Sequence, residues 1–184
     1  MSLRYGSLLI AVLILILASP AWARPAMATT GQGMRLSFGV GLGVLELHGL
    51  REAWGLAQEQ RTVRLLQGVV EFGRPGGLGV RFIGEFGLPD GPKISKFETA
   101  FLFHLPGRTA RVYLGGGSGL LFHKSKLNFS LHLALGLKME MEMDLLRATT
   151  IFFDAKLIGI IDLKDSLFLP RPPLQLTPGL AFHF

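Results

Sequence analysis

The chain contains no cysteine, which excludes disulfide bonds, cysteine-ligated metal sites and an anchor built on a lipidated cysteine. Charged residues are scarce, at 17% of the 184 residues, and no basic cluster accounts for the net charge of +6. Because nucleic-acid binding relies on such a cluster, we expect no nucleic-acid partner. Beyond residue 23 the chain also lacks an apolar run of the roughly 20 residues that a membrane-spanning helix requires.

The N-terminal segment has the three parts of a secretory signal peptide. Arg4 precedes a short apolar core from Leu8 to Ala18, and Ala21-Trp22-Ala23 forms a cleavage site of the A-x-A type. We predict an exported protein in which residues 1–23 are a cleaved signal peptide, 24–33 a short periplasmic N-terminal segment and 34–184 the folded domain. A retained N-terminal anchor helix is the alternative.

Apolar and polar residues alternate along the rest of the chain with a period of two, which is the period of a β-strand. The longest stretch runs from Leu127 to Leu145, with leucine, phenylalanine or methionine at odd positions and polar or small residues at even ones. The pattern repeats at 34–44, 62–73, 78–88, 97–105, 111–123, 151–162 and 174–184. Breakers such as Pro89-Asp90-Gly91 separate several of these segments. The sequence therefore predicts an all-β fold with about eight strands.

Glycine on the polar face indicates which face lies inside. Many of the 24 glycines occupy polar-face positions within the strands, as Gly39, Gly41, Gly115 and Gly117 do. Glycine weakens a strand and brings no benefit on a solvated face, whereas the lumen of a barrel of roughly eight strands has little room for side chains. We therefore expect the polar face to line the lumen and the apolar face to contact lipid. A secreted soluble β-sandwich with its apolar face inward is a more distant alternative.

Charged residues of both signs lie on the polar face, where they can neutralise one another. We predict a polar network that fills the lumen, made of Arg35, Arg81, Glu85, Lys96, Glu98, Arg111, Lys138, Asp154 and Lys156. In hydrocarbon every backbone polar group needs a partner, so the strands must close without a free edge. The predicted fold is a closed antiparallel up-and-down transmembrane β-barrel. Its longer connections, near 48–61 and 164–173, are expected outside the cell.

The C-terminal segment carries a resemblance to a known family. Apolar residues alternate up to a final phenylalanine, ending with Leu180, Phe182 and Phe184. This ending resembles the terminal strand of bacterial outer-membrane proteins, and the whole mature chain resembles the small eight-stranded barrels of the OmpA, OmpX and OmpW kind. The resemblance implies recognition by the barrel-assembly machinery and a place in the bacterial outer membrane, among its lipid and lipopolysaccharide. Pro178 predicts a local gap in the hydrogen bonding of this last strand.

The sharpest candidates for catalysis are His123 and Ser125, because a histidine beside a serine can act as base for a nucleophile. The pair resembles the His-x-Ser motif of PagL-type lipid A deacylases, which are barrels of this size. Those enzymes continue with asparagine, where this chain has Lys126. Glu140 and Glu142 are expected at the other membrane face, far from His123. A lipid A-modifying enzyme is therefore an alternative, and a role without catalysis is favoured.

Other polar residues have no predicted chemistry. His104, His132 and His183 lie on the polar face of different strands. His132 is expected in mid-strand and the other two near the periplasmic end, so we expect interior histidines and no metal site. Carboxylates follow at the end of the longest alternating stretch, and we expect Glu140, Glu142 and Asp144 in a solvated periplasmic turn.

The sequence as a whole predicts a monomeric outer-membrane protein with a filled lumen and no cofactor. Its role is expected to be structural, or to consist of binding through the outer loops. The connection 48–61, which carries Trp54, is the best place for a partner. Lys124 and Lys126 at the outer rim are candidates for contact with lipopolysaccharide phosphates. A narrow channel or carrier for a small solute is the first alternative.

Overall fold

The computed structural model describes residues 33–47, 61–74, 76–107, 109–124, 126–143, 146–162 and 172–183. Within these ranges the side chains of 142, 143, 146–148 and 162 are not described. The predicted signal peptide, Trp54, Ser125 and Phe184 all lie outside the described residues. In the ranges given, no helix has both the length and the hydrophobicity to cross a membrane.

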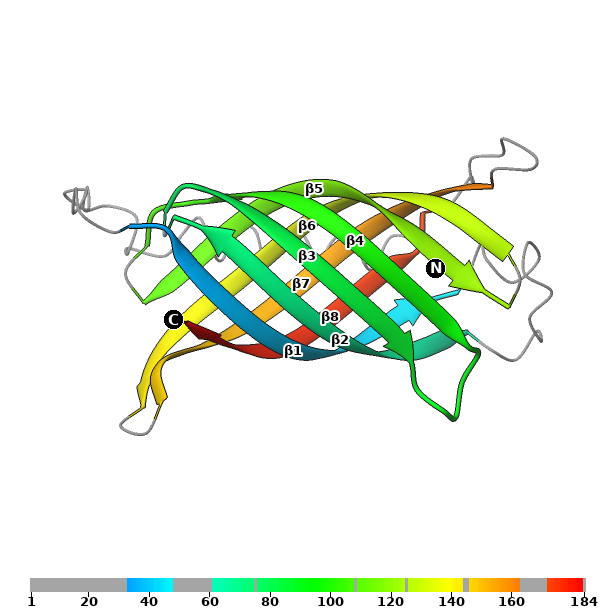
Figure 1. The fold of residues 1–184 in the computed structure, drawn as a ribbon, viewed down its shortest axis with the longest axis horizontal. Helices are drawn as coiled ribbons and strands as arrows, with labels where there is room; N and C mark the ends of the chain where they lie inside the picture. The colour runs from blue at the N-terminus through cyan, green and yellow to red at the C-terminus, as the bar shows by residue number, and fades with distance from the viewer. Residues whose placement is uncertain are drawn as a thin grey trace, which may run out of the picture. The chain divides into compact units, whose positions relative to one another are not determined.

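The described strands form a closed antiparallel barrel in which each strand pairs with its neighbours along the chain and β8 pairs with β1 (Figure 1). They are β1 Arg35–Glu46, β2 Thr62–Gly73, β3 Leu78–Gly87, β4 Ile94–His104, β5 Ala110–His123, β6 Lys126–Met143, β7 Leu146–Asp162 and β8 Leu174–His183. The predicted up-and-down barrel is confirmed. Closure leaves no sheet edge with unpaired backbone groups, which is the condition for strands in hydrocarbon.

The connections differ between the two ends of the barrel. The turn end, where β1 begins at Arg35 and β8 ends at His183, carries the short connections 74–77, 105–109 and 144–145. The loop end, where β5 ends at His123, carries the connections 47–61, 88–93, 124–125 and 163–173. As predicted, the two longest connections lie at the same end.

The outward face of the barrel is apolar. Its exposed large side chains include Phe38, Val40, Leu42, Leu66, Phe82, Phe97, Phe101, Leu114, Leu131, Leu133, Phe153 and Leu157. The charged side chains of Arg81, Lys96 and Lys156 point inward and are fully buried. This arrangement agrees with the orientation expected from the alternation and the glycines.

Pro178 lies where the pairing between β8 and β1 is interrupted. The register runs through Gly41 opposite Gly179 and resumes at Val44 opposite Leu176, so Pro178 and the residue before it have no partner on β1. Proline has no N–H group to donate, which explains a gap at this point. The predicted gap is therefore confirmed.

The hairpin of β6 and β7 continues beyond the neighbouring strands at the turn end. β6 has 18 residues and β7 has 17. The N–H of Glu140 still donates to Thr109 O beside β5 at 2.9 Å, and beyond it Met141 pairs with Thr149 on β7 alone (Figure 1). The prediction that Glu140 lies in a solvated turn is wrong, because it is part of β6. The pairing of β6 with β7 continues to Met143, with a shift of register between Met141 and Met143. The side chain of Glu142 and the whole of Asp144 lie outside the described residues.

Candidate functional site

The lumen of the barrel is filled by side chains arranged in layers. The layer nearest the loop end, which we call the apolar layer, consists of Leu45, Leu47, Val63, Leu65, Ile94, Leu121, Ile158 and Ile160. These side chains come from β1, β2, β4, β5 and β7 and from the residue after β1, and all are almost completely buried. This apolar layer was not predicted from the sequence, and it makes the lumen lining only partly polar.

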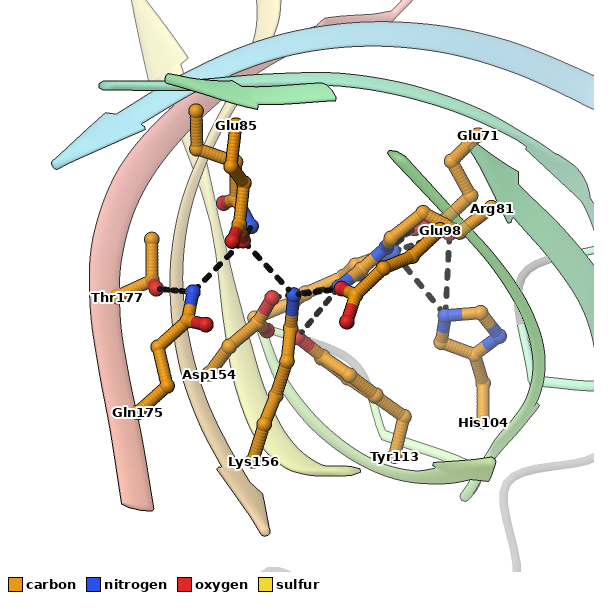
Figure 2. Close-up of polar contacts among 12 residues, drawn as sticks. Glu71, Arg81, Glu85, Glu98, His104, Tyr113, Asp154, Lys156, Gln175 and Thr177 are labelled. Carbon is orange, nitrogen blue, oxygen red and sulfur yellow. Dashed lines mark hydrogen bonds and ion pairs between the residues drawn. The ribbon is translucent and has the colours of Figure 1, made fainter. Parts of the chain in front are cut away.

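Below the apolar layer lies a set of four charged side chains, Glu85, Lys96, Glu98 and Lys156, which we call the Glu85 quartet. Lys96 Nζ lies 2.7 Å from Glu85 Oε2 and 3.1 Å from Glu98 Oε1. Lys156 Nζ lies 3.1 Å from Glu85 Oε1 and 2.9 Å from Glu98 Oε2. Each lysine therefore bridges both carboxylates, and the quartet carries no net charge. Figure 2 shows Lys156 reaching between Glu85 and Glu98.

Neutral side chains add hydrogen bonds to the Glu85 quartet. Gln67 donates to Glu85 Oε1 at 2.7 Å, and Gln175 donates to the same oxygen at 2.7 Å and to Thr177 Oγ1 at 3.1 Å. Lys96 Nζ in turn donates to Gln175 Oε1 at 2.6 Å. Such hydrogen bonds offset part of the cost of burying the four charges.

A second set of four charged side chains, Glu71, Arg81, Lys138 and Asp154, lies nearer the turn end. In this Arg81 quartet the guanidinium group donates to Glu71 Oε2 at 2.8 Å and to Asp154 Oδ2 at 2.7 Å. Lys138 forms an ion pair with Glu71. Two cations again face two anions, so this layer is also neutral. Glu71 was not among the predicted network residues, although it occupies one of the alternate positions of β2 that face inward.

Tyr113 supports the Arg81 quartet from β5. Its hydroxyl accepts a hydrogen bond of 3.0 Å from Arg81 Nη1, and its ring centroid lies 4.7 Å from the guanidinium carbon. Gly136 makes this position possible, because a Cβ atom there would overlap the ring of Tyr113. A glycine in the lumen therefore creates room for a large side chain, as expected for the polar face that lines a narrow lumen.

The turn end of the lumen opens into a small cavity, which we call the mouth. Arg111 Nη1 lies 2.8 Å from Glu140 Oε1, and Arg35 Nη1 lies 3.8 Å from the same oxygen. His183 Nε2 and Thr150 Oγ1 are 2.5 Å apart on the neighbouring strands β8 and β7. The cavity measures about 30 Å³, and its lining residues are Arg35, Ser37, Glu71, Gly73, Arg74, His104, Arg111, Lys138, Glu140, Thr150 and His183.

These contacts place every predicted network residue. Arg81, Glu85, Lys96, Glu98, Lys138, Asp154 and Lys156 belong to the two quartets, and Arg35 and Arg111 belong to the mouth. The two quartets cross the lumen through short ion pairs between buried side chains.

His132 lies at a different height from His104 and His183, as expected, because the latter two line the mouth. His104 Nε2 lies 3.2 Å from Glu71 in the Arg81 quartet, whereas His132 Nδ1 lies 3.4 Å from Glu98 in the Glu85 quartet. Among the described residues, no three histidine, aspartate or glutamate side chains gather in a way that could hold a metal ion.

The candidate catalytic histidine lies at the end of β5. His123 Nδ1 lies 3.1 Å from the backbone oxygen of Lys93, and the next residue, Lys124, has a left-handed backbone with φ of 54°. Strand β6 begins at Lys126, so Ser125 falls in a two-residue connection outside the described residues. Glu140, the carboxylate considered as a third member, lies at the other end of the barrel in the mouth. The described residues thus bring no carboxylate of the candidate set near His123.

Comparison with solved structures places the fold among small membrane barrels. No protein-family model matches the sequence, and no curated protein matches it. The N-terminal β-barrel domain of Pseudomonas aeruginosa OprF is similar over 83% of this chain and 100% of that domain, with 12% identity and a TM-score of 0.53. Neisserial surface protein A, NspA, is similar over 84% of this chain and 99% of that protein, with 10% identity and a TM-score of 0.51. The chain therefore has the eight-stranded barrel fold of these outer-membrane proteins.

Proposed function

We propose that this chain is an integral protein of the bacterial outer membrane whose barrel is closed to solutes and which acts as a structural element or through its loop end. The observation that carries the proposal is the reversal of the usual polarity: exposed Leu and Phe cover the outside, while lysine and glutamate are buried within. In water this arrangement would expose the whole apolar belt, which a soluble monomer rarely does. In a membrane it satisfies both faces.

The orientation follows from the connections. Membrane barrels of this kind have short periplasmic turns and longer external loops, so the turn end faces the periplasm and the loop end faces outward. Lys124 is exposed at the loop end, where it supports contact with lipopolysaccharide phosphates. The C-terminal alternation that ends at residues 180–184 is the segment through which the barrel-assembly machinery would recognise the chain, and the folded barrel acts as a monomer.

Membrane insertion is tested by fractionation of cells that express the full chain, followed by gel electrophoresis with and without heating. The proposal expects the protein in the outer-membrane fraction and a change of mobility on heating. Proteolysis of intact cells should cut within the connection 47–61. Recovery as a soluble protein without detergent would contradict the proposal.

The closed lumen is tested by single-channel recording of the purified protein in planar bilayers. The two neutral quartets lead us to expect no steady conductance. A regular conductance would instead support a narrow channel, the other function that a polar lumen is compatible with. Lys156→Met would then change the conductance, because this side chain lies in the middle of the lumen contacts (Figure 2).

A further inference from the structure

The mouth differs from the deeper layers of the lumen in its charge. Each quartet balances two cations with two anions. In the mouth Arg35 and Arg111 share the single carboxylate of Glu140. Arg74 lines the same cavity. Among the described side chains, the mouth therefore carries more positive than negative charge, whereas each quartet is neutral.

We propose that the mouth is a binding site for the carboxylate group of a small molecule or chain end that reaches the barrel from the turn end. Guanidinium groups donate in a planar fork that matches a carboxylate, and they keep their charge at all physiological pH values. Glu140 already occupies part of this site as an internal carboxylate, 2.8 Å from Arg111. A free carboxylate would bind by sharing the guanidinium groups with Glu140 or by displacing it.

The size of the cavity favours a carboxylate over a bulkier anion. Its volume of about 30 Å³ is enough for one or two water molecules. The two oxygens of a carboxylate fit into such a space with the rest of the ligand outside the barrel, whereas a phosphate group has further oxygens to place. The side chains of Ser37 and Thr150 line the same cavity and add hydroxyl groups near the guanidinium groups.

The site is accessible from one side only. The Arg81 quartet lies directly behind the mouth and shares Glu71 and Lys138 with its lining. Further in, the Glu85 quartet and the apolar layer fill the lumen. A ligand therefore binds at the turn end without crossing the barrel, so the site does not depend on whether the barrel conducts solutes.

The test is a titration of the full-length folded protein in detergent micelles, followed by the Nε–Hε resonances of ¹⁵N-labelled arginine. Sodium acetate is added at constant ionic strength, with inorganic phosphate as a parallel titration. Acetate should shift the Arg111 resonance saturably, and Arg35→Gln should weaken binding by roughly fivefold through loss of one ion pair at a partly exposed site. Glu140→Gln should strengthen binding by a similar factor, because it removes the competing internal carboxylate.

The matched control is Arg64→Gln, because Arg64 forms an exposed ion pair with Asp90 at 3.8 Å away from the mouth. This variant should bind acetate as the unaltered protein does. The proposal is overturned if acetate causes no saturable shift in either the unaltered protein or Glu140→Gln. It is equally overturned if phosphate binds more tightly than acetate, or if Arg64→Gln weakens binding as much as Arg35→Gln.

Discussion

Arg81 of β3 reaches across the lumen to Asp154 of β7, and the two charged groups meet at 2.7 Å. In a ring of eight strands, β3 and β7 lie on opposite sides. Both side chains are almost completely buried, and Arg81 also binds Glu71 at 2.8 Å. The pair therefore joins opposite walls of the barrel. Because both groups are shielded from bulk water, solvent cannot stabilise either charge in place of its partner.

Removing the negative charge of this pair should strongly destabilise the barrel. Asp154→Asn keeps the shape of the side chain but leaves Arg81 with Glu71 as its remaining anion, which Lys138 shares. Breaking a buried ion pair by removing one partner costs about 3–5 kcal/mol, because the other charge is left uncompensated. We expect a loss of this order in the free energy of unfolding, measured by urea titration in lipid vesicles with heat-modifiable mobility as the readout.

The control for this prediction is Asp90→Asn. Asp90 pairs with Arg64 at 3.8 Å, and its side chain is 66% exposed. Exposed ion pairs contribute about 0–1 kcal/mol, so this variant should unfold at nearly the same urea concentration as the unaltered protein. Equal losses in both variants would show that Asp154 is not in a water-excluded lumen.

A second prediction concerns the room that Gly136 leaves for Tyr113. A methyl group at position 136 would overlap the tyrosine ring, so Gly136→Ala should cost about 1–3 kcal/mol of folding free energy, as overpacked cores do. Combining it with Tyr113→Leu should cost less than the sum of the two single changes, because the clash disappears. Both measurements use the same urea titration.

Gly84→Ala provides the comparison for Gly136→Ala. The added methyl group at position 84 would lie 3.6 Å or more from its nearest neighbours, which is ordinary contact distance. This glycine faces outward on β3, so the substitution should change the free energy of unfolding very little. If both alanine variants lose the same stability, strand propensity and not the tyrosine contact governs the effect.

The fold could be predicted from the sequence because a strand has a side-chain period of two. Residues 62–73 were predicted as a strand and form β2 with the same bounds. The end of β6 was harder to place, because charged residues near Glu140 are typical of turns as well as of strands that continue beyond the membrane. Periodicity therefore places the strands, but β7 begins at Leu146 and not at the predicted Ile151, because a hairpin ends where the pairing of neighbouring strands ends.

The composition of the lumen was less predictable, because hydrophobicity does not distinguish two apolar faces of one strand. Leu65 points into the lumen and Leu66 points outward, yet the two residues are chemically identical. Leu65 and Val63 are an even number of residues away from Gln67 and Glu71. The alternation could therefore have placed them on the same inward face. The partners of each charge were also beyond the sequence, since Arg81 and Asp154 are 73 positions apart and meet only through the closure of the barrel.

The opposite directions of Leu65 and Leu66 give a third prediction. Leu65 is 0% exposed in the apolar layer, whereas Leu66 is 48% exposed on the outward face. Leu65→Ala should leave a cavity and cost about 2–5 kcal/mol. Leu66→Ala should cost clearly less, because lipid chains can fill the space in the membrane. Urea titration of both variants in the same vesicles measures the difference, and a larger loss for Leu66→Ala would contradict the assignment of the two faces.

The last prediction tests the lipid contact of the outward face by depth. Leu133 lies midway along β6 and is 69% exposed, and Leu78 lies at the first position of β3 at the turn end and is 73% exposed. An arginine on the lipid-facing side of a barrel costs about 2–4 kcal/mol at the membrane midplane and about 0–1 kcal/mol near the interface. Leu133→Arg should therefore lower the free energy of unfolding in lipid vesicles far more than Leu78→Arg does. Because the two leucines are similarly exposed, equal and small losses would mean that water, and not hydrocarbon, surrounds the middle of the barrel.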